Sequence, residues 1–582
     1  MAKIIFKSKV ILLLIIFLAS FLRLWKLSVN PVSLFGDELD LGYQAYSVLK
    51  TGQDYSGNIL PVHFHSLAEW RTPLYLYSAV PTVAVFGISP LGVRLPAAIF
   101  GILSVLGMYL LVKELLSYGM PQVNKHPRAL FAAFLMAISP WGLQYSRAGF
   151  EVTLLLVLTI FGLWLFIKSL NAGGKLLWLS VILLTLTPWV YSTAKFFTPM
   201  LLVFLFFTFR KEIFSFRRVD LIKASIVGLV IGLPIAYSTL FGGGSQRFNY
   251  ISVFSDPTIE PEIGYSRQVD ARMRGESGAG LTPTFLDRIV HNKFTYEGGK
   301  IIENYLQSFS TEFLFIKGDP NPRQSVGIGE LYRIEIIALV FGIIFFFTEK
   351  LRDRKIKFLV VFWITAGALP AALTRDGGNH ATRLILILPP LLILISYGWV
   401  ELYKRISENL KPLLTFLIIA FYAIGISFYL HECYVHYPWK SERLSHAGWG
   451  ESIKTIKSID SNYDRVVISM SGEPAWIFFA GWYQYSPDLW HKEFPIGNDV
   501  EVAGFGKISH TGKFYFGSPS KEIGVYGLGK VVDSKTLYLA NASEVGENLI
   551  MNPEKGPSDL KLIKAIPFPS GEPAFYLFSG TR

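Results

Sequence analysis

Charged residues and cysteine are both scarce in this chain. Of its 582 residues, only 17% are Asp, Glu, Lys or Arg, whereas 51% are hydrophobic. With a mean hydropathy of +0.39, this composition excludes a soluble enzyme and predicts a multi-spanning membrane protein with one sizeable aqueous part. Cys433 is the single cysteine, so no intramolecular disulfide can form, which favours a bacterial or archaeal surface. The sequence also lacks HExxH and paired CxxC spacings, so it gives no motif for a metal site.

The net charge of +12 and the pI near 9.3 do not indicate nucleic-acid binding. The basic residues stand between apolar segments instead of gathering on one soluble face. Anchoring against anionic lipid headgroups explains this distribution better.

Eleven apolar segments predict a mainly α-helical protein with about eleven membrane-spanning helices. The segments are residues 10–22, 91–112, 129–145, 152–167, 176–190, 196–209, 219–240, 331–348, 356–373, 384–400 and 412–430. Three lysines, Lys3, Lys7 and Lys9, precede the first segment and keep its start in the cytoplasm. Because basic residues interrupt the end of this segment and no small-residue cleavage site follows, we expect a retained anchor and not a signal peptide.

Residues 74–88 are also apolar, and whether they cross the membrane decides the side of every later loop. If they form an interfacial or re-entrant helix broken at Pro81, the loops with most of the clustered Lys and Arg fall in the cytoplasm, as the positive-inside rule requires. These loops are Lys113–Arg128, Lys168–Lys175, Arg210–Lys223, Lys350–Lys357 and Lys404–Lys411. The extracytoplasmic side then receives loop 26–90, the turns at 139–151, 190–196 and 374–383, loop 241–330 and everything after His431.

Residues 431–582 have a different pattern from the preceding 430. Short alternating apolar runs occur at 465–470, 513–516 and 536–539, and helical stretches occur near 448–458 and 473–484. This mixture predicts a small α/β or α+β domain outside the membrane, following a transmembrane domain over residues 1–430.

An acidic pair, Asp37-Glu38, stands at the start of the first outer loop. Carboxylates at a bilayer edge are costly unless they are used. The sequence that follows is helix-like, with Leu39, Tyr43 and Tyr46 on one face that we expect to lie in the membrane interface. Asp37 stands where an N-cap residue would stand, so a purely structural capping role is the alternative to a catalytic carboxylate.

Isolated cations occur on the same side, at the outer ends of apolar segments. They are Arg71, Arg94, Arg147, Lys195, Arg375 and Arg383. A lone arginine at a helix end commonly anchors the helix by reaching the interface, but six cations from separate segments favour a bound phosphate. Arg147 and Glu151 have i, i+4 spacing, so they either pair with each other or contact substrate. His380, in the turn between Arg375 and Arg383, is a candidate acid or base near neutral pH or a solvated loop residue.

These motifs resemble the protein O-mannosyltransferase and lipid A aminoarabinose transferase superfamily of C-type, polyprenyl-phosphate-sugar-dependent membrane glycosyltransferases. The resemblance covers about residues 1–430. It is carried by Asp37-Glu38, by the stretch Arg71-Thr72-Pro73-Leu74-Tyr75, by Phe86-Gly87-Ile88-Ser89 with Val93-Arg94-Leu95, and by Ser139-Pro140 with Ser146-Arg147 and Glu151. Arg71 replaces the family's lysine and Thr72 replaces its first proline. The tail has no obvious match to the β-trefoil domain of the eukaryotic members.

The resemblance implies inverting transfer of one hexosyl or pentosyl group from a polyprenyl-phosphate donor to an acceptor hydroxyl on a lipid, glycan or protein, at the extracytoplasmic face. It implies Asp37 as general base, with Glu38 beside it, and a donor-phosphate site of Arg71 with Arg383, for which Arg375 and Lys195 are further candidates. We expect no metal or other cofactor, because a lipid phosphate leaves as an anion. The other residues that we expect to contact substrate are Tyr43, Tyr46, Trp70, Arg94, Arg147, Glu151, Tyr191 and His380.

Other functions fit the same topology. A lipid-linked oligosaccharide ligase or polymerase uses similar donors and differs in product size. A glycolipid transporter needs polar residues along a path through the membrane, whereas the middle of each span here is mostly apolar. A non-catalytic scaffold does not require acids and cations on so many separate outer loops.

Overall fold

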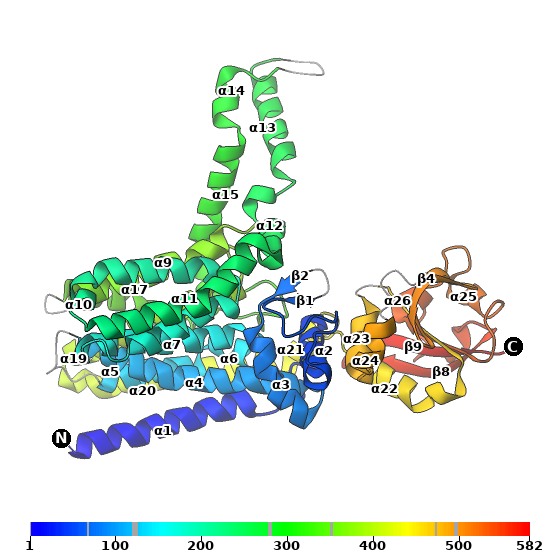
Figure 1. The fold of residues 1–582 in the computed structure, drawn as a ribbon, viewed down its shortest axis with the longest axis horizontal. Coiled ribbons are helices and arrows are strands. Elements are labelled where there is room, and N and C mark those ends of the chain that lie inside the picture. Colours follow the sequence, from blue (N-terminus) through cyan, green and yellow to red (C-terminus); the bar gives the residue numbers. More distant parts are fainter. Residues whose placement is uncertain are drawn as a thin grey trace.

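The computed structural model describes residues 2–66, 69–118, 126–276, 282–349, 353–471, 474–493 and 499–582. Figure 1 shows three parts: a bundle of long helices, a helical arm that leaves the bundle sideways, and a C-terminal domain built on a β-sheet. The C-terminal domain lies at one end of the bundle, which we call the site end. The N-terminus lies at the opposite end.

The apolar segments form the bundle. Six helical runs are long and apolar enough to cross a membrane: Pro90–Ser117 (α4), Val152–Asn171 (α7), Arg218–Phe241 (α11), Arg354–Ala372 (α17), Ala381–Arg405 (α18 to α19) and Glu408–Ser441 (which contains α20, Lys411–His431). Shorter apolar helices are Leu74–Phe86 (α3), His126–Ile138 (α5), Leu177–Trp189 (α8 with η1), Ala194–Thr208 (α9) and Glu335–Thr348 (α16), and α1 covers Ala2–Leu24. Every predicted apolar segment lies largely on helix, which confirms the mainly helical class. The number of helices that cross the membrane stays a prediction.

Two predictions about helix boundaries are wrong. Segment 129–145 is not one helix, because the chain leaves helical geometry at Ser139 and α6 (Pro140–Ser146) begins at the proline. The α conformation is disfavoured before a proline, and the Ser139 hydroxyl caps the new helix by accepting a hydrogen bond from the Gly142 amide. Helix α3, in turn, runs through Pro81 without a break. Its 13 residues span about 20 Å, which is still shorter than a hydrocarbon core of about 30 Å.

Several of the basic loops meet at the end of the bundle opposite the C-terminal domain. Glu212, in α10 (Arg210–Phe214), forms an ion pair with Lys355 and accepts a hydrogen bond from the Tyr118 hydroxyl. Arg128 forms an ion pair with Glu401. Residues 119–125 and 350–352 of these loops lie outside the described residues. The grouping agrees with the prediction that the basic loops share one side of the membrane.

The C-terminal domain has a seven-stranded mixed sheet with strand order β4-β5-β6-β3-β7-β9-β8. Its strands are β3 (Arg465–Ile468), β4 (Asp499–Val502), β5 (Gly506–Thr511), β6 (Phe514–Phe516), β7 (Thr536–Asn541), β8 (Leu560–Pro567) and β9 (Pro573–Gly580). β3 pairs in parallel with β6 and β7, and the other pairs are antiparallel. Helices α22 (Trp449–Ile459), α23 (Ala475–Tyr483) and α24 (Pro487–Glu493) accompany the sheet. A mixed α and β domain, as the sequence predicts, is therefore confirmed.

Helix α2 (Gly36–Thr51) joins the bundle to this domain. Its apolar face does not lie in the membrane interface, as the sequence led us to expect, because α23 and α24 cover it. Leu39 packs so closely on Gly481 that a Cβ there would lie 2.5 Å from the leucine Cγ, and this contact requires glycine. Tyr43 is fully buried and donates a hydrogen bond of 3.2 Å to the Tyr485 carbonyl.

Outer loop 241–330 contains the helical arm. Its helices are α12 (Gln246–Ile251), α13 (Ile259–Met273), α14 (Phe285–Val290) and α15 (Lys293–Gln307). Residues 277–281 lie outside the described residues. A two-stranded ribbon, β1 (Phe64–Ser66) and β2 (Glu69–Arg71), lies in the first outer loop and ends in Arg71.

Candidate active site

Asp37 lies in the first turn of α2 and does not cap it. The N-cap is Phe35, whose backbone is extended and whose side chain makes no capping hydrogen bond. The capping role considered for Asp37 is therefore wrong, since the helix begins one residue earlier, at Gly36. A carboxylate in a first turn is still stabilised by the helix dipole. The Asp37 side chain is 48% exposed, so it is accessible to a substrate.

Arg71 approaches Asp37 from the end of β2. Its Nη2 donates to Asp37 Oδ1 at 2.5 Å, and its Nη1 lies 3.8 Å from Asp40 Oδ2. Burial raises the pKa of Asp37, but the ion pair and hydrogen bond from Arg71 outweigh it and hold that pKa below its ordinary value. Asp37 and Arg71 were predicted separately, as general base and as phosphate ligand. In the structure they form one ion pair.

Asp40 is a site residue that the sequence analysis did not select. It lies three residues after Asp37, hence on the same side of α2, and is completely buried. Its Oδ2 accepts a hydrogen bond of 2.6 Å from the Ser66 hydroxyl, whereas Oδ1 has no hydrogen-bond partner among the described residues. Burial raises its pKa to about 6, although Arg71 opposes this shift. The i, i+3 spacing from Asp37 could have identified Asp40 in the sequence, because it places both carboxylates on one side of a helix.

Arg247, in α12, acts electrostatically on three titratable groups of the site. It lies close enough to lower the pKa of Asp37, Glu151 and His380. Glu151 precedes α7 and has a raised pKa because of burial, which Arg71 and Arg247 only partly offset. Arg247 was not predicted from the sequence, because nothing in residues 241–330 shows that α12 folds back over β2.

The turn at 374–383 supplies two further arginines. Arg383 donates to the Thr374 hydroxyl at 2.7 Å and to Asp376 at 2.6 Å. Arg375 donates to the Tyr250 carbonyl at the root of the arm and stacks on the Tyr250 ring at 5.6 Å. The pKa of His380 is lowered to about 3, first by burial and then by Arg383. His380 is therefore neutral at neutral pH, and its side chain is mostly buried, so it is not a solvated loop residue.

Lys195 faces a different partner. Its Nζ donates to His63 Nε2 at 3.0 Å and to the Gly244 carbonyl at 2.8 Å. Burial and the nearby Lys195 lower the pKa of His63 to about 4, so the imidazole is a neutral acceptor. Trp70 is half-buried beside this group, where its ring lies against Gly243. The sequence analysis did not identify His63.

Three of the predicted site residues have structural partners inside the protein: Glu38, Arg94 and Arg147. Arg94 holds Glu38 through two hydrogen bonds of 2.8 Å, both side chains are fully buried, and the Gly149 amide donates to Glu38 at 2.7 Å. Arg147 is buried and donates to the backbone carbonyls of Leu22, Arg23, Trp25 and Asn30. The structure therefore does not bring these three side chains to the Asp37–Arg71 pair. Among the described residues, no ion pair joins Arg147 to Glu151.

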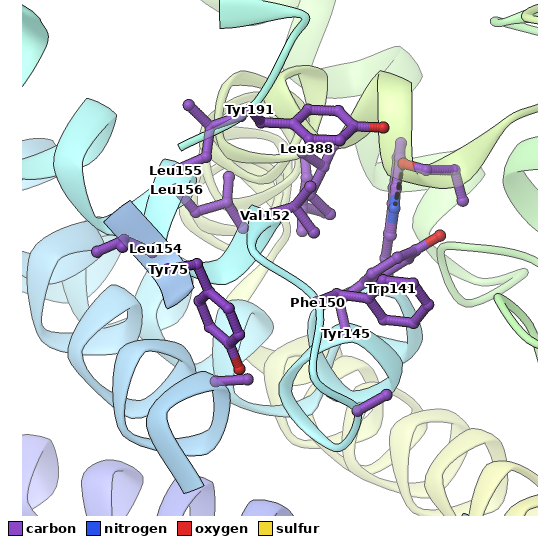
Figure 2. Packing of buried hydrophobic residues seen from close by; sticks show 14 of the residues in the cluster. Tyr75, Trp141, Tyr145, Phe150, Val152, Leu154, Leu155, Leu156, Tyr191 and Leu388 are labelled. Atoms are coloured by element: carbon purple, nitrogen blue, oxygen red, sulfur yellow. Dashed lines mark hydrogen bonds between the residues drawn. The ribbon is translucent and has the colours of Figure 1, made fainter. Parts of the chain in front are cut away.

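The aromatic residues expected to stack on substrate are mostly enclosed. Tyr43 and its neighbour Tyr46 belong to the α2 packing, and Tyr43 lies 5.7 Å from Trp490 between ring centroids. Figure 2 shows Tyr191 among Val152, Leu155 and Leu388, with only 5% of the residue exposed. Trp141 lies opposite it and donates to the Ala381 carbonyl, which fixes the start of α18. Trp70 directly precedes Arg71 in β2, and its ring lies 5.1 Å from the His65 ring between centroids.

Fold and site together define a membrane protein with many apolar helices and a charged site at one end of the bundle. Residues 71–237 match the model of the family described as dolichyl-phosphate-mannose-protein mannosyltransferase. The match begins at Arg71 and includes Arg94, Arg147, Glu151 and Lys195. The resemblance predicted from the sequence motifs is confirmed over this segment.

Solved structures with a similar arrangement are also found. The Archaeoglobus fulgidus oligosaccharyltransferase in the apo form is 15% identical with a TM-score of 0.48, over 81% of this chain and 63% of that chain. ArnT from Cupriavidus metallidurans bound to undecaprenyl phosphate is 11% identical with a TM-score of 0.47, over 98% and 97%. Arabinofuranosyltransferase AftD from Mycobacteria is 11% identical with a TM-score of 0.47, over 99% and 40%. The chain spans less than two thirds of the length of the archaeal oligosaccharyltransferase. A search of curated proteins gives no match.

Proposed function

We propose that this chain is a membrane glycosyltransferase that transfers one sugar from a polyprenyl-phosphate donor to an acceptor hydroxyl, with inversion. The observation that carries the proposal is the exposed Asp37 paired with Arg71, where the match to the mannosyltransferase family begins. A carboxylate and a guanidinium in contact are the two groups that such a transfer needs at its reacting centre.

In the proposed reaction, Asp37 takes the proton of the acceptor hydroxyl as the oxygen attacks the anomeric carbon. The bond from that carbon to the phosphate oxygen breaks, and the lipid phosphate leaves as an anion. Arg71 stabilises the charge on the phosphate, because guanidinium groups bind phosphate through charge-assisted hydrogen bonds. No metal takes part in this proposal, because cations neutralise the leaving group.

Donor binding and the basicity of Asp37 are linked in this arrangement. While Arg71 pairs with Asp37, the pKa of the carboxylate is low and the carboxylate is a weak base. A donor phosphate that attracts Arg71 removes part of this stabilisation and raises the basicity of Asp37. The base is then strongest when the donor is in place.

A second cation for the phosphate comes from a later loop. We keep Arg383 as the first choice, with Arg375 and Lys195 as alternatives, and add Arg247 because of its electrostatic effect on Asp37. Arg383 already has Thr374 and Asp376 as partners, so it would act from a fixed position.

Loss of the gene tests the proposal directly. Mass spectrometry of surface glycans and glycoproteins, with and without the gene, should show the loss of a single sugar from one class of acceptor. Loss of a whole oligosaccharide would instead favour a ligase or polymerase. An unchanged set of products, with the donor lipid retained on one side of the membrane, would favour a glycolipid transporter.

We further propose that the site end is extracytoplasmic, because the basic loops group at the other end. Reporter fusions after Gly87, Ala172 and Pro438 should place the first and third positions outside and Ala172 inside the cell. Arg217 and Arg354 should be protected from external reagents. A cytoplasmic Pro438 fusion would overturn both the span count and the side of the site.

A further inference from the structure

The helical arm has its own small core and leaves one apolar surface uncovered. Between α13 and α15, Val253, Ile259 and Ile263 are buried, with Tyr296 and Ile301 packed against them. In Figure 1 the arm runs sideways, at a steep angle to the long helices of the bundle. α14 and α15 lie on the side that faces away from the C-terminal domain, and α13 lies on the side nearer that domain.

The outward surface of α14 and α15 carries large apolar side chains with little cover inside the chain. Seven of them are 51% to 85% exposed: Phe285, Leu286, Ile289, Val290, Phe294, Ile302 and Leu306. An exposed apolar surface of this extent marks a contact with a membrane or another protein. α13 also exposes apolar side chains, Tyr265, Val269 and Met273, but they lie among more polar ones, which include Glu262, Gln268 and Arg272.

The base of the arm contacts the last turns of α17 at the site end of the bundle. Asn304 in α15 donates to the carbonyls of Ala372 (3.2 Å) and Thr374 (2.7 Å), at the site end of α17. The Tyr305 hydroxyl donates to the Thr365 carbonyl, seven residues before the end of that helix. At 1.5 Å per residue this is about 10 Å below the helix end, and amphipathic interfacial helices are buried by about 5–10 Å.

Exposed apolar side chains are found both on α11 of the bundle and at the root of the arm. Only 17% of the apolar stretch of α11 is buried inside the protein. Its last turns expose Leu233, Tyr237, Leu240 and Phe241, and Tyr250 and Phe254 follow at the root of the arm. Exposed apolar side chains therefore occur on α11, a candidate membrane-spanning helix, at the root of the arm and on α15.

We propose that the arm is a membrane-surface element, with the apolar surface of α14 and α15 inserted into the leaflet at the site end. Its ligand is the lipid bilayer, and α13 faces the water. This proposal is independent of the reaction catalysed. The Val253 amide donates to the Leu373 carbonyl and the Arg375 amide donates to the Ile251 carbonyl. Because these bonds join the root of the arm to the 374–383 turn, the bilayer contact also holds that turn in place.

Single-cysteine labelling tests the proposal on the whole protein. Cys433→Ala removes the one native thiol, and an environment-sensitive fluorophore is then attached at Phe294→Cys or Ile302→Cys in nanodiscs of phosphatidylethanolamine and phosphatidylglycerol. Matched controls carry the label at Glu262→Cys or Gln268→Cys on α13. We expect lipids with a quencher near the headgroup to quench the α15 labels strongly and aqueous iodide to quench the α13 labels.

Equal iodide quenching at all four positions would overturn the proposal and assign the apolar surface to a protein partner. A second measurement needs no substitution. The unmodified protein in nanodiscs that contain a photoactivatable phospholipid should be labelled in peptides from 285–306 and not in peptides from 259–273. Labelling confined to the bundle helices would contradict a bilayer-bound arm.

Discussion

Asp37→Asn should abolish turnover while the fold is kept and the donor binds at least as tightly, because Arg71 is freed from its partner. A general base contributes about 10²–10⁴-fold in rate, and asparagine cannot accept the acceptor's proton. The fold should tolerate the change, because the Asp37 side chain is half-exposed and asparagine has the same shape as aspartate. Turnover by the purified variant, together with a donor titration, measures the two effects separately.

Glu38→Gln is the matched control for this experiment. Glu38 is fully buried between Arg94 and the Gly149 amide, so its neutralisation leaves a buried guanidinium without its charge partner. Breaking a buried pair in this way costs about 3–5 kcal/mol, and we expect loss of folded protein before any loss specific to turnover. If Asp37→Asn keeps wild-type turnover, the base is another carboxylate, and Glu151 is the next candidate.

Arg71→Ala should weaken donor binding by one to two orders of magnitude and also reduce the rate. The estimate follows from about 1.5–3 kcal/mol for a charge-assisted hydrogen bond at a partly dehydrated site. Arg71→Lys should be the mildest change, because the charge is kept and the resembling family has lysine there. Donor titrations of both variants in detergent or nanodiscs measure the effect.

Arg71→Ala should also change the pH profile of kcat/KM. Arg71 holds the pKa of Asp37 low, and the carboxylate must be ionised to act as a base. Removing Arg71 raises this pKa, so the acid limb of kcat/KM, which reports the free enzyme, should move to higher pH. An unmoved acid limb would mean that Arg71 does not control Asp37.

Parallel titrations of Arg247→Ala, Arg375→Ala and Arg383→Ala identify the second phosphate ligand. Arg443→Ala is a control, because Arg443 is exposed on the C-terminal domain and pairs with Glu572. If the donor KM stays at the wild-type value in Arg71→Ala and in all three of these variants, the phosphate site lies elsewhere, with Lys195 as the next candidate.

Local patterns were sufficient to predict the helices and part of the site. Apolar run length predicts the bundle helices, and β-branched and aromatic runs predict strands β3, β6 and β7. Asp37 and Arg71 were both selected because charge at an apolar boundary is costly unless it is paired or used. Their direct contact was not predicted, since it depends on how β2 folds back to the start of α2.

The remaining errors concern side chains whose partners are set by tertiary contacts and not by the local sequence. Arg147 and Glu151 do not pair, because Arg147 ends α6 and Glu151 precedes α7, so the i, i+4 rule for one continuous helix does not apply. Arg94 and Arg147 bind groups around residues 22–38, which a sequence pattern does not show. Tyr43 is covered by residues more than 400 positions later in the chain.

The packing of α2 against Gly481 has a consequence for the order in which the protein matures. α2 precedes α23 and α24 by more than 400 residues, so it leaves the ribosome well before them. Until they arrive, Leu39 and Tyr43 lack the surface that covers them in the finished protein. The helix that carries Asp37 therefore reaches its final position only after α23 and α24 have been made. Partly made chains, already in the membrane and able to meet donor lipid, would not yet hold the carboxylate in place to act on it.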